Sequence, residues 1–392
     1  MMRWWGVLVV GLLLIMALPT LGGSSQAAGS AAVFAVGKGI NLDGWFVHSN
    51  PIPEIWQSGV GSADLRLLRT LGITFVRFPV EPQAFIAAGG GLDRTNLPYL
   101  DAAIALILRG GLNVVLDIHP DADYQKSVLL GGAPLTRYLR FISALAGHLV
   151  GHDPHRLALE PMNEPFNPQT GACDASSSWD WNPLQQRLWR AARRAAPRLT
   201  LVVTGPCWSG ADQLPQVTAL PDPNLIYTFH FYTPMLFTHQ GATWAGDPFP
   251  YLSGVPYPAT AARVNKMLPQ LLAGIADPTT RGDVEAQLQQ YGADGWDKNL
   301  LREHLQTAVD WGKAHHLRLF LGEFGVYKPH APVRDRYTWV RHVREIAEGA
   351  GVGWAMWEYN KDFGLLDDAG NPDTCMITAL GLRQPTHGTA RC

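Results

Sequence analysis

Short apolar segments of strand character alternate along most of the chain with longer segments in which apolar residues recur at helical spacing. This alternation is typical of a parallel sheet whose strands are joined by helices, and eight repeats fit a sheet closed into a barrel. We therefore predict an α/β protein, a (β/α)8 TIM barrel built as a single domain. The eight predicted strands are 37–46, 74–80, 113–119, 157–165, 199–205, 225–234, 317–325 and 352–359.

Helical patterns fill most of the intervals between the predicted strands. The predicted helices are 64–71, capped by Ser62, and 96–108, 135–150, 181–196, 299–315 and 334–348. Residues 235–298 are the one long interruption of this alternation. They are rich in proline, glycine and aromatic residues and include a helical segment at 261–272. Because this insertion follows the sixth strand, we expect it to lie on the catalytic face and shape a substrate cleft. The alternative is a cover over the barrel rim.

Two of the predicted strands end in a glutamate. The fourth reads Leu-Ala-Leu-Glu-Pro-Met-Asn-Glu-Pro and delivers Asn163 and Glu164 before Pro165, which cannot donate to a strand ladder. The seventh reads Leu-Arg-Leu-Phe-Leu-Gly-Glu-Phe-Gly and carries Glu323 between glycines. Either carboxylate alone could simply cap or pair. Together at the carboxyl ends of parallel strands, they are the two groups that hydrolysis of a glycosidic bond requires.

Polar and aromatic side chains close most of the other predicted strands as well. Taken singly, Arg77 could form a core ion pair, His119 could be a satisfied core histidine and Trp357 could be ordinary packing. Their joint placement at one barrel face predicts a binding site instead. Glu160 lies deeper on the fourth strand, and we expect it to pair with Arg77. The sixth strand adds His230 and Tyr232.

The Asn-Glu-Pro and Gly-Glu-Phe-Gly motifs, with the Arg, His, His-x-Tyr and Trp positions, resemble glycoside hydrolase family 5, the cellulase family, over essentially the whole barrel. The resemblance implies a retaining β-glycosidase with Glu164 as the acid/base and Glu323 as the nucleophile. It implies that Asn163 binds the sugar 2-hydroxyl, and that Arg77 and Tyr232 orient Glu323. The remaining roles implied are sugar or Glu164 contacts for His119 and His230, and sugar stacking for Trp357.

The substrate is constrained less tightly than the reaction. The overall pattern is closest to bacterial endo-β-1,4-glucanases, while the opening Gly-Ile-Asn-Leu-Asp-Gly-Trp-Phe also resembles members that act on β-1,3-glucans, and mannan stays open. A non-catalytic carbohydrate-binding barrel and a structural envelope protein are the other classes, and the presence of both glutamates argues against them. Candidate stacking residues for a polymer are Trp45, Tyr124, Trp208 and Trp244.

Charge and composition limit the partners. The formal net charge is −2 and the chain has no long basic run, which argues against nucleic acid. No compact set of histidine, cysteine and aspartate suggests a metal, and we expect no cofactor. The expected partner is a polysaccharide or oligosaccharide, bound by a monomer.

The amino-terminal residues 1–27 have the pattern of a secretory signal peptide. Arg3 supplies the positive start, 7–18 form the apolar run, and Ser25-Gln26-Ala27 fits a cleavage site. A transmembrane anchor is the alternative, but the run is short against the ~20 residues that span a bilayer. We therefore expect a secreted or periplasmic protein without stable membrane association after cleavage, with residues 28–392 as the catalytic domain.

Four cysteines allow three disulfide connectivities in an exported protein. Cys173 and Cys207 follow consecutive strands, and loops on one barrel face can bring them together. We expect this pair first. Cys375 and Cys392 would then tie down the carboxyl-terminal tail.

Overall fold

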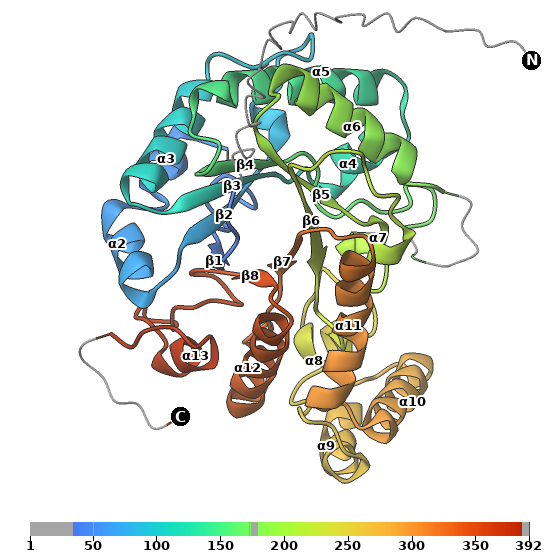
Figure 1. Ribbon diagram of the computed structural model, residues 1–392. Coiled ribbons are helices and arrows are strands. Elements are labelled where there is room, and N and C mark those ends of the chain that lie inside the picture. The colour runs from blue at the N-terminus through green and yellow to red at the C-terminus, as the bar shows by residue number, and fades with distance from the viewer. Residues whose placement is uncertain (1–33, 50, 172, 174–178, 386–391) are drawn as a thin grey trace, which may run out of the picture. The chain divides into compact units, whose positions relative to one another are not determined.

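The computed structural model describes residues 34–49, 51–171, 173, 179–385 and 392. Its centre is a closed barrel of parallel strands arranged in chain order, with the last strand paired to the first (Figure 1). The predicted (β/α)8 barrel is therefore confirmed. The strands are β1 (Lys38–Asn41), β2 (Phe75–Val80), β3 (Asn113–Ile118), β4 (Leu157–Glu160), β5 (Thr200–Thr204), β6 (Leu225–His230), β7 (Leu319–Glu323) and β8 (Gly353–Met356).

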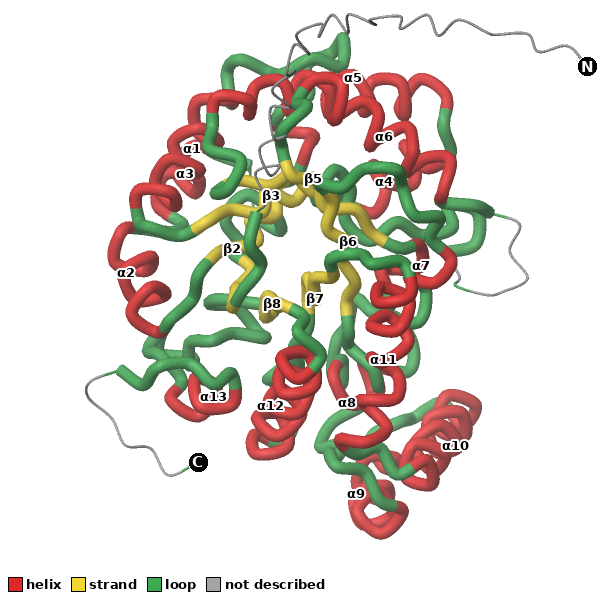
Figure 2. The backbone as a smooth tube through the Cα atoms, in the orientation of Figure 1, coloured by secondary structure: helices red, strands yellow, loops and turns green. Residues whose placement is uncertain are grey.

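Helices surround the strands, as the tube view shows (Figure 2). The predicted helices are all present, with ends that differ by one to a few residues. The helices are α1 (Pro53–Ser58), α2 (Ser62–Leu71), α3 (Leu97–Arg109), α4 (Ala122–Leu129), α5 (Gly132–His148), α6 (Asn182–Ala195), α7 (Pro206–Ser209), α8 (Met235–Thr238), α9 (Ala261–Ala273), α10 (Pro278–Asp294), α11 (Lys298–Ala314), α12 (Val333–Gly349) and α13 (Thr374–Ala379). Short 3-10 helices are η1 (Pro82–Ala84), η2 (Leu149–Gly151), η3 (Leu214–Gln216) and η4 (Phe249–Tyr251).

Two details of the predicted boundaries were wrong. Ser62 is the first residue of α2 and not its cap. Gly61 is the N-cap, and its backbone N–H donates to the Asp64 carboxylate at 2.8 Å. The strands also end earlier than predicted. β4 stops at Glu160, so Asn163 and Glu164 lie in the loop that follows, although the Asn163 N–H still donates to the Ile118 carbonyl of β3 at 2.9 Å.

The barrel interior is filled by one layer of apolar side chains. Because alternate residues of a strand point inward, each strand from β2 to β8 contributes one residue to this layer, and its next inward residue lies two positions further along. The apolar layer is fully buried. It contains Phe75, Val115, Ala158, Val202, Ile226, Phe320 and Ala355, with Phe34 packed beside them.

The larger core lies between the strands and the outer helices. In α12, Trp339, Val340, Val343, Ile346 and Ala347 are buried, at the three-to-four-residue spacing of a helix with one apolar side. The outward-facing strand residues, such as Val76 and Phe78 of β2, are buried in the same cluster.

The insertion after β6 divides into two parts. The first part includes α8 and contacts the loop that follows β7, where the Tyr327 N–H donates to the Thr238 carbonyl at 2.8 Å. The second part is the α9–α10 pair, which lies outside the ring of helices near α11 (Figure 1). Two contacts connect this part to α12. The hydroxyl of Tyr257, just before α9, lies 2.9 Å from His342 Nδ1, and Arg263 of α9 forms an ion pair with Asp335. The sequence pattern predicted α9 but missed α10.

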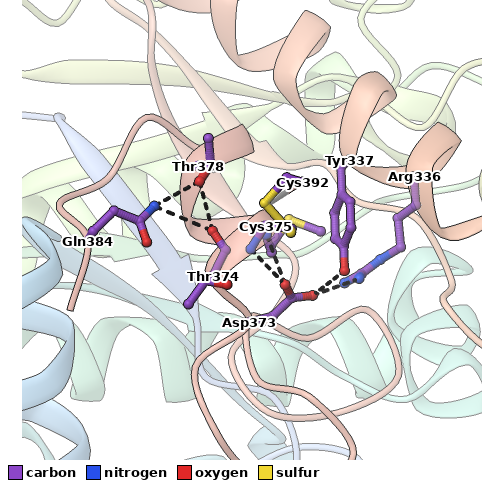
Figure 3. Close-up of a disulfide and its surroundings, with 9 residues drawn as sticks. Arg336, Tyr337, Asp373, Thr374, Cys375, Thr378, Gln384 and Cys392 are labelled. Atoms are coloured by element: carbon purple, nitrogen blue, oxygen red, sulfur yellow. Dashed lines mark hydrogen bonds and ion pairs between the residues drawn. A yellow bond between two sulfur atoms is a disulfide. The ribbon is translucent and has the colours of Figure 1, made fainter. Parts of the chain in front are cut away.

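A disulfide joins Cys375 to Cys392, as predicted for the carboxyl-terminal tail (Figure 3). Cys375 lies in α13, whose N-cap Asp373 also accepts a hydrogen bond from the Tyr337 hydroxyl at 2.8 Å. The other two cysteines are thiols in hydrogen-bonding contact, and burial together with this contact raises the pKa of Cys173. Their oxidation stays a prediction.

The predicted signal peptide lies outside the described residues. Within the described ranges, no helix is both long enough and apolar enough to span a membrane.

Candidate active site

A polar layer lies directly above the apolar layer of the barrel. It is formed by the next inward residues of the strands, two positions beyond Phe75, Val115 and Ala158. These residues are charged although they are fully buried, and such groups are stable only when they are paired. They are Arg77, Asp117 and Glu160, each with no exposed surface.

The Arg77 guanidinium holds this layer together. Its Nε and Nη2 donate to the two Glu160 carboxylate oxygens at 2.8 and 2.9 Å, the paired contact expected from the sequence. Nη2 also lies 3.0 Å from Asp117 Oδ2, and Nη1 donates to Asn41 Oδ1 at 3.0 Å. The third carboxylate is Glu323, whose Oε1 accepts from Nη1 at 2.6 Å. One planar cation thus orients three buried carboxylates.

Glu323 is the last residue of β7 and is held at both carboxylate oxygens. Arg77 donates to Oε1, and the Tyr232 hydroxyl donates to Oε2 at 2.9 Å. The preceding Gly322 leaves room at this level of the barrel. A Cβ at this position would lie 2.4 Å from Thr228 Oγ1 and 3.1 Å from His230 Nε2. These two hydrogen bonds therefore fix the orientation of the Glu323 carboxylate. A group that reacts with a bound substrate needs such a fixed orientation.

Glu164 follows β4 in a left-handed backbone conformation, with a φ of 38°. Non-glycine residues adopt this conformation at an energetic cost and are often found at functional sites. Its Oε1 lies 2.6 Å from His230 Nδ1, and 22 % of its side chain is exposed. Burial, helped by the charges of Asp117 and Glu160 and opposed by Arg77, raises the pKa of Glu164 to about 8. Burial lowers the pKa of His230 to about 4, so at neutral pH Glu164 is protonated and His230 is neutral.

The two strand-end glutamates lie close together. A carboxylate oxygen of Glu164, a ring nitrogen of His230 and a carboxylate oxygen of Glu323 all lie within 4.8 Å of one another. Among the described residues, this is also the group whose geometry could hold a metal ion. The Arg77 guanidinium at 2.6 Å from Glu323 opposes a cation there.

His119 and Asn163 form a second chain of contacts beside the glutamates. Asn163 Oδ1 accepts from Arg77 Nη2 at 2.7 Å, and its Nδ2 lies 3.1 Å from His119 Nε2. The other ring nitrogen, Nδ1, lies 2.9 Å from Asp117 Oδ2. Since the amide nitrogen must donate, His119 accepts at Nε2 and carries its proton at Nδ1. Both ring nitrogens of His119 are thus used by the protein. Burial lowers the pKa of His119 well below its usual range.

Trp357 follows β8 and is almost fully buried, with 8 % of its surface exposed. Its ring is stacked on the His119 ring at 5.9 Å between centroids and an interplanar angle of 27°. The structure thus gathers Arg77, Asn163, Glu164, Glu323 and their histidine, tyrosine and tryptophan neighbours at the carboxyl ends of the strands.

Comparison with known proteins agrees with this geometry. The model of the family "Cellulase (glycosyl hydrolase family 5)" matches residues 33–363. The chain belongs to glycosyl hydrolase family 5. It is therefore a glycoside hydrolase of the cellulase type, as the motifs predicted.

Relatives within the family are similar over nearly the whole chain. Endoglucanase C of Acetivibrio thermocellus is 26 % identical over 359 residues, which cover 89 % of this chain and 98 % of the relative. A hyperthermophilic endo-β-1,4-glucanase solved in complex with substrate is 23 % identical and shares the fold with a TM-score of 0.67, covering 88 % of this chain and 97 % of its own. Thermotoga maritima Cel5A in complex with mannotriose gives a TM-score of 0.68 at 21 % identity, covering 88 % and 97 %.

The aromatic residues predicted to stack on sugars in this family 5 enzyme differ in their exposure. Trp208 is 43 % exposed and stacks on Phe166 at 4.7 Å, next to the Glu164 loop. Trp244 is 61 % exposed and meets the Tyr327 ring edge-on at 4.8 Å. Both rings are available to a polymer.

Trp45 is a correction, because it is only 2 % exposed and its Nε1–H donates to the Trp56 carbonyl at 2.8 Å. It packs in the core beside Phe46 and Phe78 and cannot stack on a polysaccharide. Tyr124 is only partly exposed, packed on the Tyr138 ring at 6.3 Å.

Residues missed at the site are Asp117, Asn41 and His48. The signal for Asp117 was present, because it precedes His119 by two positions and must share its inward face. Asn41 ends β1, where its amide donates to the Gly322 carbonyl at 3.0 Å and accepts from Arg77. The position of His48 depends on a loop that no periodic pattern describes.

Proposed function

We propose that this protein is a retaining endo-β-1,4-glucanase, with Glu164 as the acid/base and Glu323 as the nucleophile. The observation that carries the proposal is the close approach of the two glutamates, with oxygens within 4.8 Å. Retaining enzymes hold their carboxyl groups about 5–5.5 Å apart, whereas inverting enzymes leave about 6.5–9.5 Å for a water molecule.

In the first step, Glu323 attacks the anomeric carbon and the bond to the leaving sugar breaks. The electron pair of that bond goes to the glycosidic oxygen, which takes the proton from Glu164. The raised pKa of Glu164, about 8, keeps that proton in place at neutral pH. His230 supports this state because its Nδ1–H donates to Oε1 and leaves Oε2 to carry the acid proton.

In the second step, Glu164 acts as a base. It takes a proton from water, and the oxygen attacks the anomeric carbon of the glycosyl–enzyme while the bond to Glu323 breaks. Glu323 then leaves as a carboxylate, whose charge is stabilised by the Arg77 and Tyr232 hydrogen bonds. Asn163, which Arg77 and His119 hold in place, would bind the sugar 2-hydroxyl through its amide.

The choice of β-1,4-glucan rests on relatives that carry the name endoglucanase and on a protein of the same fold that is named an endo-β-1,4-glucanase. The exposed rings of Trp208 and Trp244 are suited to successive sugars of a polymer. We place the action outside the cytoplasm, after removal of residues 1–27. A β-mannanase is the second candidate, because a protein with the same fold has been solved with mannotriose.

A reducing-sugar assay on carboxymethylcellulose, lichenan, laminarin and mannan tests the substrate. We expect the highest kcat/KM on carboxymethylcellulose or lichenan, and no turnover by Glu323→Gln on any of them. A preference for laminarin or mannan would refute the β-1,4-glucan assignment, and full activity of Glu323→Gln would refute the role of Glu323.

A further inference from the structure

His48 stands at the mouth of the site, in the loop that follows β1. Its backbone is left-handed, with a φ of 50°. Histidine, asparagine and aspartate are the non-glycine residues found most often in this region, which still costs energy. Two carboxylates fix the residue, since its N–H donates to Glu81 Oε1 at 3.2 Å and its Nδ1 lies 2.8 Å from Asp43 Oδ1. The loop is thus built to hold this imidazole in one place.

The imidazole of His48 faces the floor of the site. Its ring lies edge-on to the His119 ring at 5.3 Å and to the Trp357 ring at 6.2 Å. About half of its side chain, 54 %, is exposed. Asp43 occupies Nδ1, and within the described ranges of the chain no hydrogen bond engages Nε2. One polar atom therefore remains available beside the ring on which a sugar would stack.

His119 cannot serve in the same way. Asp117 engages its Nδ1 and Asn163 engages its Nε2, and the side chain is largely covered. The family resemblance implied that His119 contacts the sugar or Glu164. The geometry gives His119 the task of orienting Asn163 and leaves His48 as the imidazole that is open to a ligand.

We propose that His48 is a specificity-determining residue that binds a hydroxyl group of the sugar stacked on Trp357 through its Nε2. The proposal rests on the glycosidase function assigned above and deepens it. Asp43 orients the ring, as carboxylates orient functional histidines in general.

The charges around His48 favour its protonated form, in which both ring nitrogens carry a proton. Burial lowers its pKa, but the hydrogen bond to Asp43 and the carboxylates of Asp43, Glu81 and Glu323 outweigh this and raise it. At mildly acidic pH the ring is a cation with an N–H at Nε2. A hydrogen bond from a charged donor is stronger than one between neutral groups.

His48→Asn tests the proposal, because asparagine accepts a left-handed backbone but is too short to reach the sugar. The control is His316→Asn. His316 has a φ of 53°, is exposed and lies at the amino end of β7, on the face opposite the site. The substrates are an aryl β-cellobioside and a set of its monodeoxy derivatives in the ring next to the aryl group.

We expect kcat/KM of His48→Asn on the parent substrate to fall roughly ten-fold, the loss of one hydrogen bond. On the monodeoxy substrate that lacks the hydroxyl bound by His48, neither protein can form this hydrogen bond. The kcat/KM values of wild type and His48→Asn should therefore agree within about two-fold on that substrate. His316→Asn should match wild type throughout. An unchanged kcat/KM of His48→Asn on the parent, or the same deficit on every monodeoxy substrate, would overturn the proposal.

A binding experiment separates this inference from the proposed function. Cellotriose is titrated calorimetrically into Glu323→Gln and into Glu323→Gln/His48→Asn. Weaker binding by the double variant supports the role of His48 even if the wild-type enzyme prefers another glycan in the activity assay. Equal affinity in the two proteins contradicts it, whatever the reaction turns out to be.

Discussion

Replacing Arg77 with methionine should destabilise the protein strongly, and more at alkaline than at neutral pH. The side chain has no exposed surface and binds Glu160, Asp117 and Glu323. Methionine fills much of the space but leaves three buried carboxylates without their cation. Removing one partner from a buried ion pair costs about 3–5 kcal/mol, and we expect a loss of this size at pH 7.

The pH dependence follows from the carboxyl groups that Arg77 neutralises. In the wild type, burial already raises the pKa of Asp117 to about 7 and raises that of Glu160, while Arg77 opposes both shifts. Without Arg77 both pKa values rise further, so the folded state retains protons that the unfolded state loses as the pH increases. Relative to the wild type, each such group then costs about 1.4 kcal/mol per pH unit between its wild-type folded pKa and its higher folded pKa in the variant. The deficit should therefore grow as the pH rises above about 7, the wild-type pKa of Asp117.

Urea unfolding followed by tryptophan fluorescence measures the effect at pH 7 and at pH 9. Lys298→Met is the control, because Lys298 pairs with Glu345 at 2.5 Å while both side chains are 34 % exposed. Such surface pairs contribute at most about 1 kcal/mol. A loss for Arg77→Met no larger than that of the control, or one that does not change with pH, would refute the reasoning.

Three further predictions concern activity and oxidation. The rate on glycosides with poor leaving groups should fall above about pH 8, as Glu164 loses its proton, and a pH–rate profile with no such alkaline limb would count against the acid role. Trp244→Ala should weaken binding to polysaccharide but leave a small activated aryl glycoside unaffected, and equal losses on both would exclude a distal platform. Cys173 and Cys207 should form a disulfide in the exported protein, whereas mass spectrometry that finds both alkylated without reduction would contradict this.

The barrel and the pair of glutamates, Glu164 and Glu323, could be predicted because their sequence signals are local. Strand and helix periodicities repeat along the chain, and Asn163-Glu164-Pro165 closely follows β4 while Glu323 ends β7. The contact between Glu160 and Arg77 also followed from strand depth, and the structure confirms it at 2.8 and 2.9 Å.

The remaining contacts depend on how distant segments meet. Trp45 looks like a loop aromatic in the sequence, yet it packs against Phe78 of β2, a neighbour that local pattern cannot reveal. His119 sits where a sugar-binding histidine is expected, but Asp117 and Asn163 use both of its nitrogens. Which of two polar groups stays open to a ligand is decided by three-dimensional hydrogen bonding and not by residue type.

Proton NMR of the earliest hydrolysis products tests the central claim most directly. If Glu323 attacks the anomeric carbon, the first product keeps the β configuration, and the α anomer appears only later by mutarotation. Glu323→Ala should then be inactive, and azide should restore turnover of an activated glycoside as the inverted α-glycosyl azide. Appearance of the α anomer first would contradict the assignment of Glu323 as nucleophile and with it the retaining mechanism.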